Sequence, residues 1–115
     1  MYSGWVIDEK SRNKILEVFP PKFDRVIAHH VTKELSGNMP EIATIEVIGY
    51  AEDSKIECIV VRVNGTEYRA DGKMYHVTLS VDSKSDAKPV DSNKITTKYT
   101  AVTPFYITGE PFVSK

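Results

Sequence analysis

Two copies of one tripeptide, His-Val-Thr, are the residues of this sequence whose types and spacing could do chemistry. They are His30-Val31-Thr32 and His76-Val77-Thr78, one in each half of the chain. An imidazole titrates at about pH 6.5, so near neutrality one histidine can donate a proton while its partner accepts one. Cleavage of a phosphodiester needs such a pair, one at the attacking water and one at the leaving oxygen. The threonine hydroxyls could donate hydrogen bonds to the phosphate oxygens.

The first tripeptide lies in an alternating segment that predicts a strand over about 27–35. Side chains two residues apart in a strand share a face, so His30 and Thr32 project together while Val31 projects into the core. By the same alternation His29 is expected on the opposite face, where it packs or lies at an edge.

The second tripeptide lies in a strand predicted over about 73–81, which places His76, Thr78 and Ser80 on one face. Ser80 is therefore expected to be a further polar group that contacts the substrate. Lysines near the motifs could attract a phosphate, and an aromatic ring could stack on a nucleobase. The lysines considered are Lys33, Lys73 and Lys88, and the rings are Tyr2, Trp5, Tyr50, Tyr75 and Tyr106. We choose Lys33, Lys88, Trp5 and Tyr106 as the predicted substrate-binding residues.

The remaining elements must hold these two strands in place. Asp8 can cap a helix from about Glu9 to Phe19, which Pro20-Pro21 ends. Asn64-Gly65 predicts a two-residue hairpin. Further strands are predicted at about 4–7, 43–51, 56–63 and 100–107, a surface loop at 82–93, and either helix or coil at 91–98. No linker divides the chain, so one α+β domain of antiparallel strands with few helices is expected over residues 1–115.

Composition limits the classes of function. The 115 residues are 41% hydrophobic and 27% charged, which is typical of a globular domain with its own core. A net charge of −1 argues against a surface for long nucleic acids and leaves a small nucleotide or an RNA end as the expected partner. Neither a basic, apolar leader nor a long apolar run occurs, so a cytoplasmic location without membrane association is expected. No obligate protein partner is evident.

Other chemistries lack their motifs. A zinc site would need three or four converging ligands, and neither His-x-x-x-His nor Cys-x-x-Cys occurs, so no metal and no cofactor is predicted. The single cysteine, Cys58, lies in an apolar run and is expected to be a buried, inert thiol. There is no Gly-x-Ser-x-Gly turn for a nucleophilic serine and no glycine-rich phosphate loop.

The paired motif, once in each half of a small α+β protein, resembles the two-histidine (2H) phosphoesterase superfamily. An initial strand at Trp5–Asp8, a helix and then the first motif strand follow the order typical of that family. The segment Lys88-Pro89-Val90, with Ser92-Asn93, is similar to a stretch that follows the second motif in some small members. The chain departs from the pattern at Lys33, where an apolar residue is usual.

This resemblance implies a bilobed fold of antiparallel sheets with one or two helices, pseudo-twofold symmetry and a central groove. The groove would hold His30, Thr32, His76 and Thr78 as catalytic residues. The implied activity is metal-independent cleavage of a 2′,3′-cyclic phosphate, a 2′–5′ linkage or a cyclic (oligo)nucleotide, as in RNA-repair and phage members.

Two other functions are compatible with the same residues. One is a non-catalytic module that holds a nucleotide or an RNA end in the same groove. The other is a structural or interaction domain whose histidines do not act together. The two near-identical motifs also leave open which histidine is the acid and which is the base.

Overall fold

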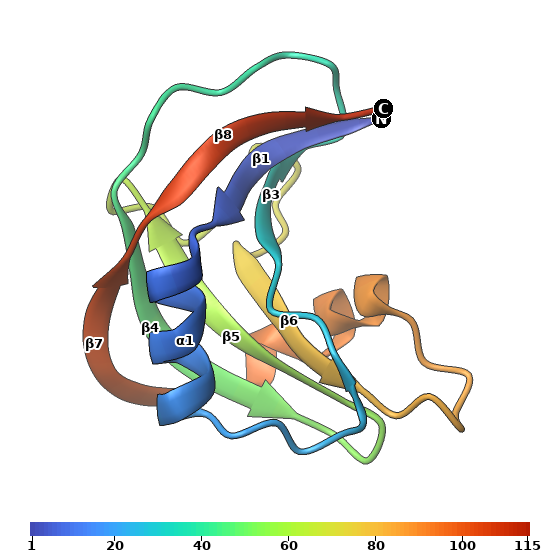
Figure 1. Cartoon of the computed structure of the whole chain (residues 1–115). Coiled ribbons are helices and arrows are strands. Elements are labelled where there is room, and N and C mark those ends of the chain that lie inside the picture. The colour runs from blue at the N-terminus through green and yellow to red at the C-terminus, as the bar shows by residue number, and fades with distance from the viewer.

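Eight strands form two antiparallel sheets in the computed structural model, which describes residues 1–115 (Figure 1). The smaller sheet contains β1 (Tyr2–Ile7), β3 (His30–Glu34) and β8 (Gly109–Ser114), in the order β3-β1-β8. The larger sheet contains β2 (Arg25–Val26), β4 (Ile45–Glu52), β5 (Ile56–Val63), β6 (His76–Val81) and β7 (Thr100–Ile107), in the order β2-β6-β5-β4-β7. Helix α1 (Glu9–Val18) and two 3₁₀ helices, η1 (Pro89–Lys94) and η2 (Thr96–Lys98), complete the chain. The predicted α+β class with antiparallel strands and few helices is confirmed.

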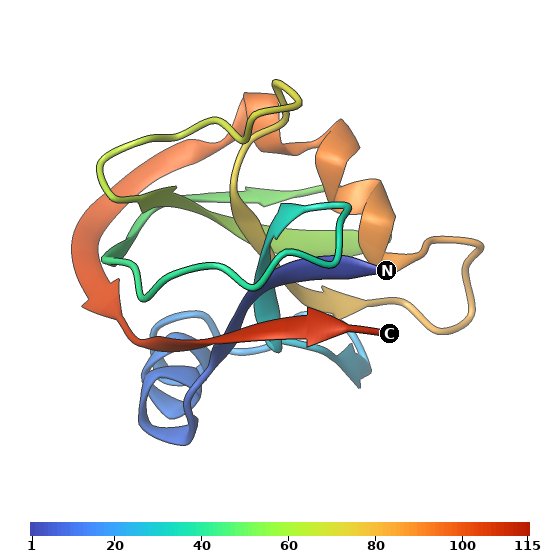
Figure 2. The ribbon, with the colours of Figure 1, turned by 90° about the horizontal axis from the view of Figure 1, so that it is seen from above.

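The core lies between the two sheets and under α1. Val31 and Val77, the central residues of the two tripeptides, are both fully buried in it, as strand alternation predicts. Figure 2 shows β1 and β8 running side by side to the two chain ends, where Tyr2 pairs with Ser114. No helix has the length and hydropathy that crossing a lipid bilayer requires.

The chain passes from the larger sheet to the smaller one at Ala28. The amide of Ala28 donates to the carbonyl of Thr78 in β6 at 2.9 Å, whereas the carbonyl of His29 accepts from Ile7 in β1 at 2.9 Å. Ala28 has a φ of 44°, in the left-handed region that a side chain disfavours. Arg12 of α1 donates to the Ala28 carbonyl at 3.1 Å and so supports this corner. The corner brings the first motif beside the second.

Several predicted elements are confirmed. Helix α1 is capped by Asp8, whose Oδ1 accepts from the amide of Ser11 at 2.7 Å, and it ends just before Pro20-Pro21. Asn64 and Gly65 have φ values of 49° and 80°, which the two-residue hairpin requires. The chain reverses between β5 and the following segment as these residues predict.

Other predictions differ from the structure. A single strand over 27–35 is wrong, because the corner at Ala28 divides this segment between the two sheets. Strand β8 is not among the predicted elements, since glycine and proline usually interrupt strands. Pro111 is tolerated because β8 is an edge strand, where one side needs no backbone donor. Most of residues 91–98, which the sequence left open between helix and coil, form 3₁₀ turns of η1 and η2.

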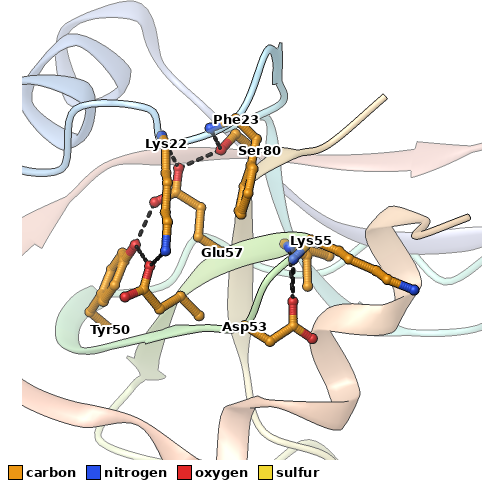
Figure 3. Close-up of polar contacts among 9 residues, drawn as sticks. Lys22, Phe23, Tyr50, Asp53, Lys55, Glu57 and Ser80 are labelled. Atoms are coloured by element: carbon orange, nitrogen blue, oxygen red, sulfur yellow. Dashed lines mark hydrogen bonds and ion pairs between the residues drawn. The ribbon is translucent and has the colours of Figure 1, made fainter. Parts of the chain in front are cut away.

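A buried carboxylate, Glu57 of β5, ties the segment after α1 to the larger sheet (Figure 3). Its Oε2 accepts from the Lys22 amide at 2.8 Å and from the hydroxyl of Ser80. Its Oε1 accepts from the Tyr50 hydroxyl at 2.6 Å. Burial, together with the Glu57 carboxylate, raises the pKa of Tyr50, so the phenol keeps its proton and stays a donor. A buried charge of this kind is stable only while its donors are in place.

We expect Tyr50→Phe to lower the free energy of unfolding by about 1–3 kcal/mol, because Glu57 loses one donor and stays buried. The ring itself is preserved, including its stacking on Phe19 at 5.5 Å between centroids. Urea unfolding of the two proteins measures the difference. Tyr68→Phe is the control, since Tyr68 is 53% exposed, and its effect should stay within about 0.5 kcal/mol. Equal effects of the two substitutions would contradict this role for Glu57.

Candidate functional site

Both tripeptides open into one cavity of about 270 Å³, which lies where β3 meets β6. Its wall includes His30 and Thr32 of β3 together with His76 and Thr78 of β6. The structure therefore brings together all four residues that the motif singles out as catalytic. The remaining lining residues are Tyr2, Ile27, His29, Leu35, Arg69, Lys73, Pro89, Val90 and Asn93.

His76 has a defined proton position. Its Nδ1 lies 2.9 Å from the carbonyl oxygen of Met74, and a carbonyl can only accept, so Nδ1 carries the hydrogen. The other ring nitrogen, Nε2, is left for proton exchange. Burial lowers the pKa of His76, the bond to Met74 acts in the opposite direction, and the charges of Arg69 and Lys73 lower it further.

His30 lies among other rings. It stacks on Tyr2 with 5.1 Å between centroids and meets the edge of Phe112 at 5.7 Å. Burial lowers the pKa of His30 to about 4, and repulsion from His29 and His76 adds to the effect. His30 is therefore neutral at pH 7 and able to accept a proton.

His29 lines the same cavity, and its Nδ1 lies 3.0 Å from Nδ1 of His30. The prediction that His29 faces away from His30 is wrong. Strand β3 begins only at His30, and the left-handed backbone of Ala28 precedes His29, so strand alternation does not extend to this residue.

The neutral state of His30 predicts a pH effect on stability. The folded pKa of about 4 lies below the unfolded value of 6.5, so between these values only the unfolded chain takes up the proton. The stabilisation is therefore complete above about pH 6.5, and at most about 3 kcal/mol is lost as the pH falls to 4. Urea unfolding across this range measures it, and His30→Gln should remove this part of the decline. An identical decline in wild type and variant would refute the assignment.

The two threonines are not equivalent. Thr32 makes no side-chain hydrogen bond within the chain, so its hydroxyl is free to donate to a ligand. The Thr78 hydroxyl donates to the carbonyl of Pro89 at 3.1 Å and lies 2.8 Å from the Ser92 hydroxyl. Both partners belong to helix η1. The hydroxyl hydrogen of Thr78 is therefore already used in a hydrogen bond and is not free to bind a phosphate.

The predicted substrate-binding residues lie outside the cavity wall. Trp5 is buried in the core, with 2% of its surface exposed. Lys33 lines a different depression together with Trp5, because strand alternation turns Lys33 away from the face that carries Thr32. Ser80 is fully buried against Glu57 in the network described above. Tyr106 lies on β7 at the far edge of the larger sheet, and Lys88 is exposed just before η1. Strand order rather than proximity to the motifs decides which side chains reach the cavity.

Other residues supply the cavity wall instead. Lys73, which lies near the second motif, and the ring of Tyr2 do line it. Arg69 and Asn93 line it as well. Arg69 belongs to the turn that enters β6, and its polar surroundings contain no signal that it reaches a cavity. The lining thus contains an arginine and a lysine but no aspartate or glutamate, which favours an anionic ligand.

The arrangement places two imidazoles that can exchange protons in one cavity wall with Arg69 and Lys73. No three His, Cys, Asp or Glu side chains converge in a way that could hold a metal ion. Cys58 is fully buried, as predicted, and burial raises the pKa of its thiol to about 12, so the thiol keeps its proton at neutral pH. Comparison of the chain with protein-family models, with curated proteins and with solved structures finds no match.

Proposed function

We propose that this chain is a metal-independent phosphodiesterase of the 2H type that acts on a 2′,3′-cyclic phosphate, a 2′–5′ linkage or a cyclic (oligo)nucleotide. The observation that carries the proposal is the shared cavity, whose wall contains His30 and His76 from different sheets together with Arg69 and Lys73. No carboxylate lines this wall, although Asp71 pairs with Arg69. In this proposal the two sheets correspond to the two pseudo-symmetric lobes of the 2H fold, each contributing one motif strand.

The protonation states of the two histidines assign the base to His30 and the acid to His76 in this proposal. His30 is neutral at pH 7 and would act as the base: it takes a proton from water, and the resulting hydroxide oxygen forms a bond to phosphorus. The P–O bond to the leaving ribose oxygen breaks, and His76 would deliver a proton to that oxygen from Nε2. An anionic substrate beside His76 favours its imidazolium form, and the Met74 carbonyl holds the ring in position.

The test is an assay of 2′,3′-cyclic nucleotides, 2′–5′-linked dinucleotides and cyclic oligonucleotides in excess chelator. We expect one of these classes to yield a phosphomonoester and a free hydroxyl at an undiminished rate. Loss of turnover on chelation that a divalent cation restores would overturn the metal-independent mechanism. Absence of product from every class would overturn the enzymatic proposal.

The hydrogen bond from the Thr78 hydroxyl to the Pro89 carbonyl favours a second candidate function. This function is a non-catalytic module that binds a nucleotide or an RNA end in the same cavity. Such a module would retain the anion-favouring wall but lack one of the two hydroxyl donors. Calorimetry that finds saturable binding of a cyclic nucleotide, with no product after prolonged incubation, would identify this function.

A further inference from the structure

Arg69 is held rigidly at the edge of the candidate site. Its side chain is 4% exposed, and its Nε and Nη2 donate to the two carboxylate oxygens of Asp71 at 3.1 and 2.7 Å. The backbone of the same turn is closed by two hydrogen bonds, from Arg69 to the Lys73 carbonyl at 2.7 Å and from Gly72 to the Arg69 carbonyl at 3.0 Å. A bidentate pair of this kind fixes the plane of the guanidinium as well as its position.

One end of this guanidinium has no partner. Nη1 makes no hydrogen bond to the protein, although Arg69 forms part of the cavity wall. Its charge also reaches His76, whose pKa it lowers. Nη1 is not among the buried polar atoms that lack a partner, so it is accessible from outside the protein and can donate to water or to a ligand. Arg69 thus has free donors in the same cavity wall as His76.

The His76 side of the cavity also lacks the donor that the motif suggests. Thr78 gives its hydroxyl hydrogen to the Pro89 carbonyl, and η1 is held against β6 by this contact. Thr32, on the His30 side of the cavity, makes no such hydrogen bond within the chain. A phosphate held between the two histidines thus has a hydroxyl donor on one side and needs a different donor on the other.

We propose that Arg69 is that donor, and that its Nη1 binds a non-bridging oxygen of the reacting phosphate on the His76 side. This inference rests on the proposed function and assigns to Arg69 the role that the paired motif assigns to Thr78. The ligand is a phosphodiester anion whose negative charge grows as water attacks. A fixed guanidinium stabilises that added charge without having to reorganise.

The kinetic test compares Arg69→Gln with Arg62→Gln on a 2′,3′-cyclic nucleotide. Arg62 lies on β5 outside the cavity wall and pairs with Glu46 and Glu67, so its substitution removes the same charge elsewhere. We expect kcat/KM to fall about 10²–10³-fold for Arg69→Gln and to stay at the wild-type value for Arg62→Gln. Thermal unfolding of both variants checks that they fold. Equal rates for Arg69→Gln and wild type would overturn the assignment and leave the proposed function standing.

The threonines provide a second kinetic comparison. Thr32→Val should reduce kcat/KM by about 10²–10³-fold, because it removes a free donor to the phosphate. Thr78→Val should reduce it far less, since that hydroxyl already binds Pro89. A larger loss for Thr78→Val than for Thr32→Val would overturn the inference, because Thr78 would then be the donor on the His76 side.

A binding measurement separates this inference from catalysis. Calorimetry with adenosine 3′-monophosphate and with adenosine reports the contribution of the phosphate without any turnover. We expect Arg69→Gln to weaken the nucleotide about tenfold to a hundredfold and to leave adenosine unaffected. If the wild type binds the nucleotide in this way but cleaves no cyclic phosphate, the proposed function fails and the Arg69 assignment holds. Equal nucleotide affinity in variant and wild type, or no wild-type binding of the nucleotide, would overturn the assignment.

Discussion

His76→Ala and His30→Ala are each expected to reduce kcat/KM for the cleaved phosphodiester by about 10²–10⁴-fold, the contribution typical of a positioned acid or base. Both imidazoles line the same cavity, and in the proposed reaction each substitution removes one of the two proton transfers. Initial rates at low substrate concentration measure the loss. The folded state should be preserved, since both side chains face the cavity while the neighbouring Val31 and Val77 fill the core.

A double variant gives the sharper result. If the two histidines act on one phosphate as a unit, as proposed, the variant with both His30→Ala and His76→Ala should be hardly slower than the slower single variant. His29→Ala is the comparison within the same wall, and it should have a much smaller effect because the proposed reaction gives His29 no proton transfer. Activity that survives either single substitution would eliminate the paired-histidine mechanism, whatever the substrate.

Gly4→Ala is expected to destabilise the fold by about 3 kcal/mol or more. A Cβ atom at Gly4 would lie 2.0 Å from the carbonyl oxygen of Val31 and 3.0 Å from Cα of Thr32. Both neighbours are backbone atoms, so relief requires β1 and β3 to separate. The pairing of these strands is also irregular between Ser3 and Gly4. Thermal or urea unfolding measures the loss.

The effect of Gly4→Ala should extend to activity, since β3 carries His30 and Thr32. Gly37→Ala is the matched control: its Cβ would meet only the flexible end of the Met1 side chain, at 2.6 Å from Sδ. The stability of that variant should stay within about 0.5 kcal/mol of wild type. Equal stabilities of the two variants would show that β1 and β3 can move apart at little cost.

The reliable predictions from sequence concern features with local causes. The Asp8 cap depends on three residues, the Asn64-Gly65 hairpin depends on two, and the burial of Val31 and Val77 follows from strand alternation. Each of these is determined by the backbone geometry of a short segment. Two histidines on separate strands can form an acid–base pair only if the fold brings them together.

Whether they meet, and what surrounds them, depends on contacts between distant segments. Ala28 adopts a strained corner because β1 and β6 each bind one side of it, and this corner turns His29 toward the cavity. Helix η1 folds over Thr78 and takes up its hydroxyl.

The type and face of the doubled His-Val-Thr residues were thus readable in the amino-acid order, since a strand repeats every two residues. The residues that surround them in the cavity wall were not readable in this way: Arg69 reaches the cavity, whereas Trp5 is buried in the core outside it. The reason is that sheet order and long-range packing, which no local pattern encodes, decide which side chains converge.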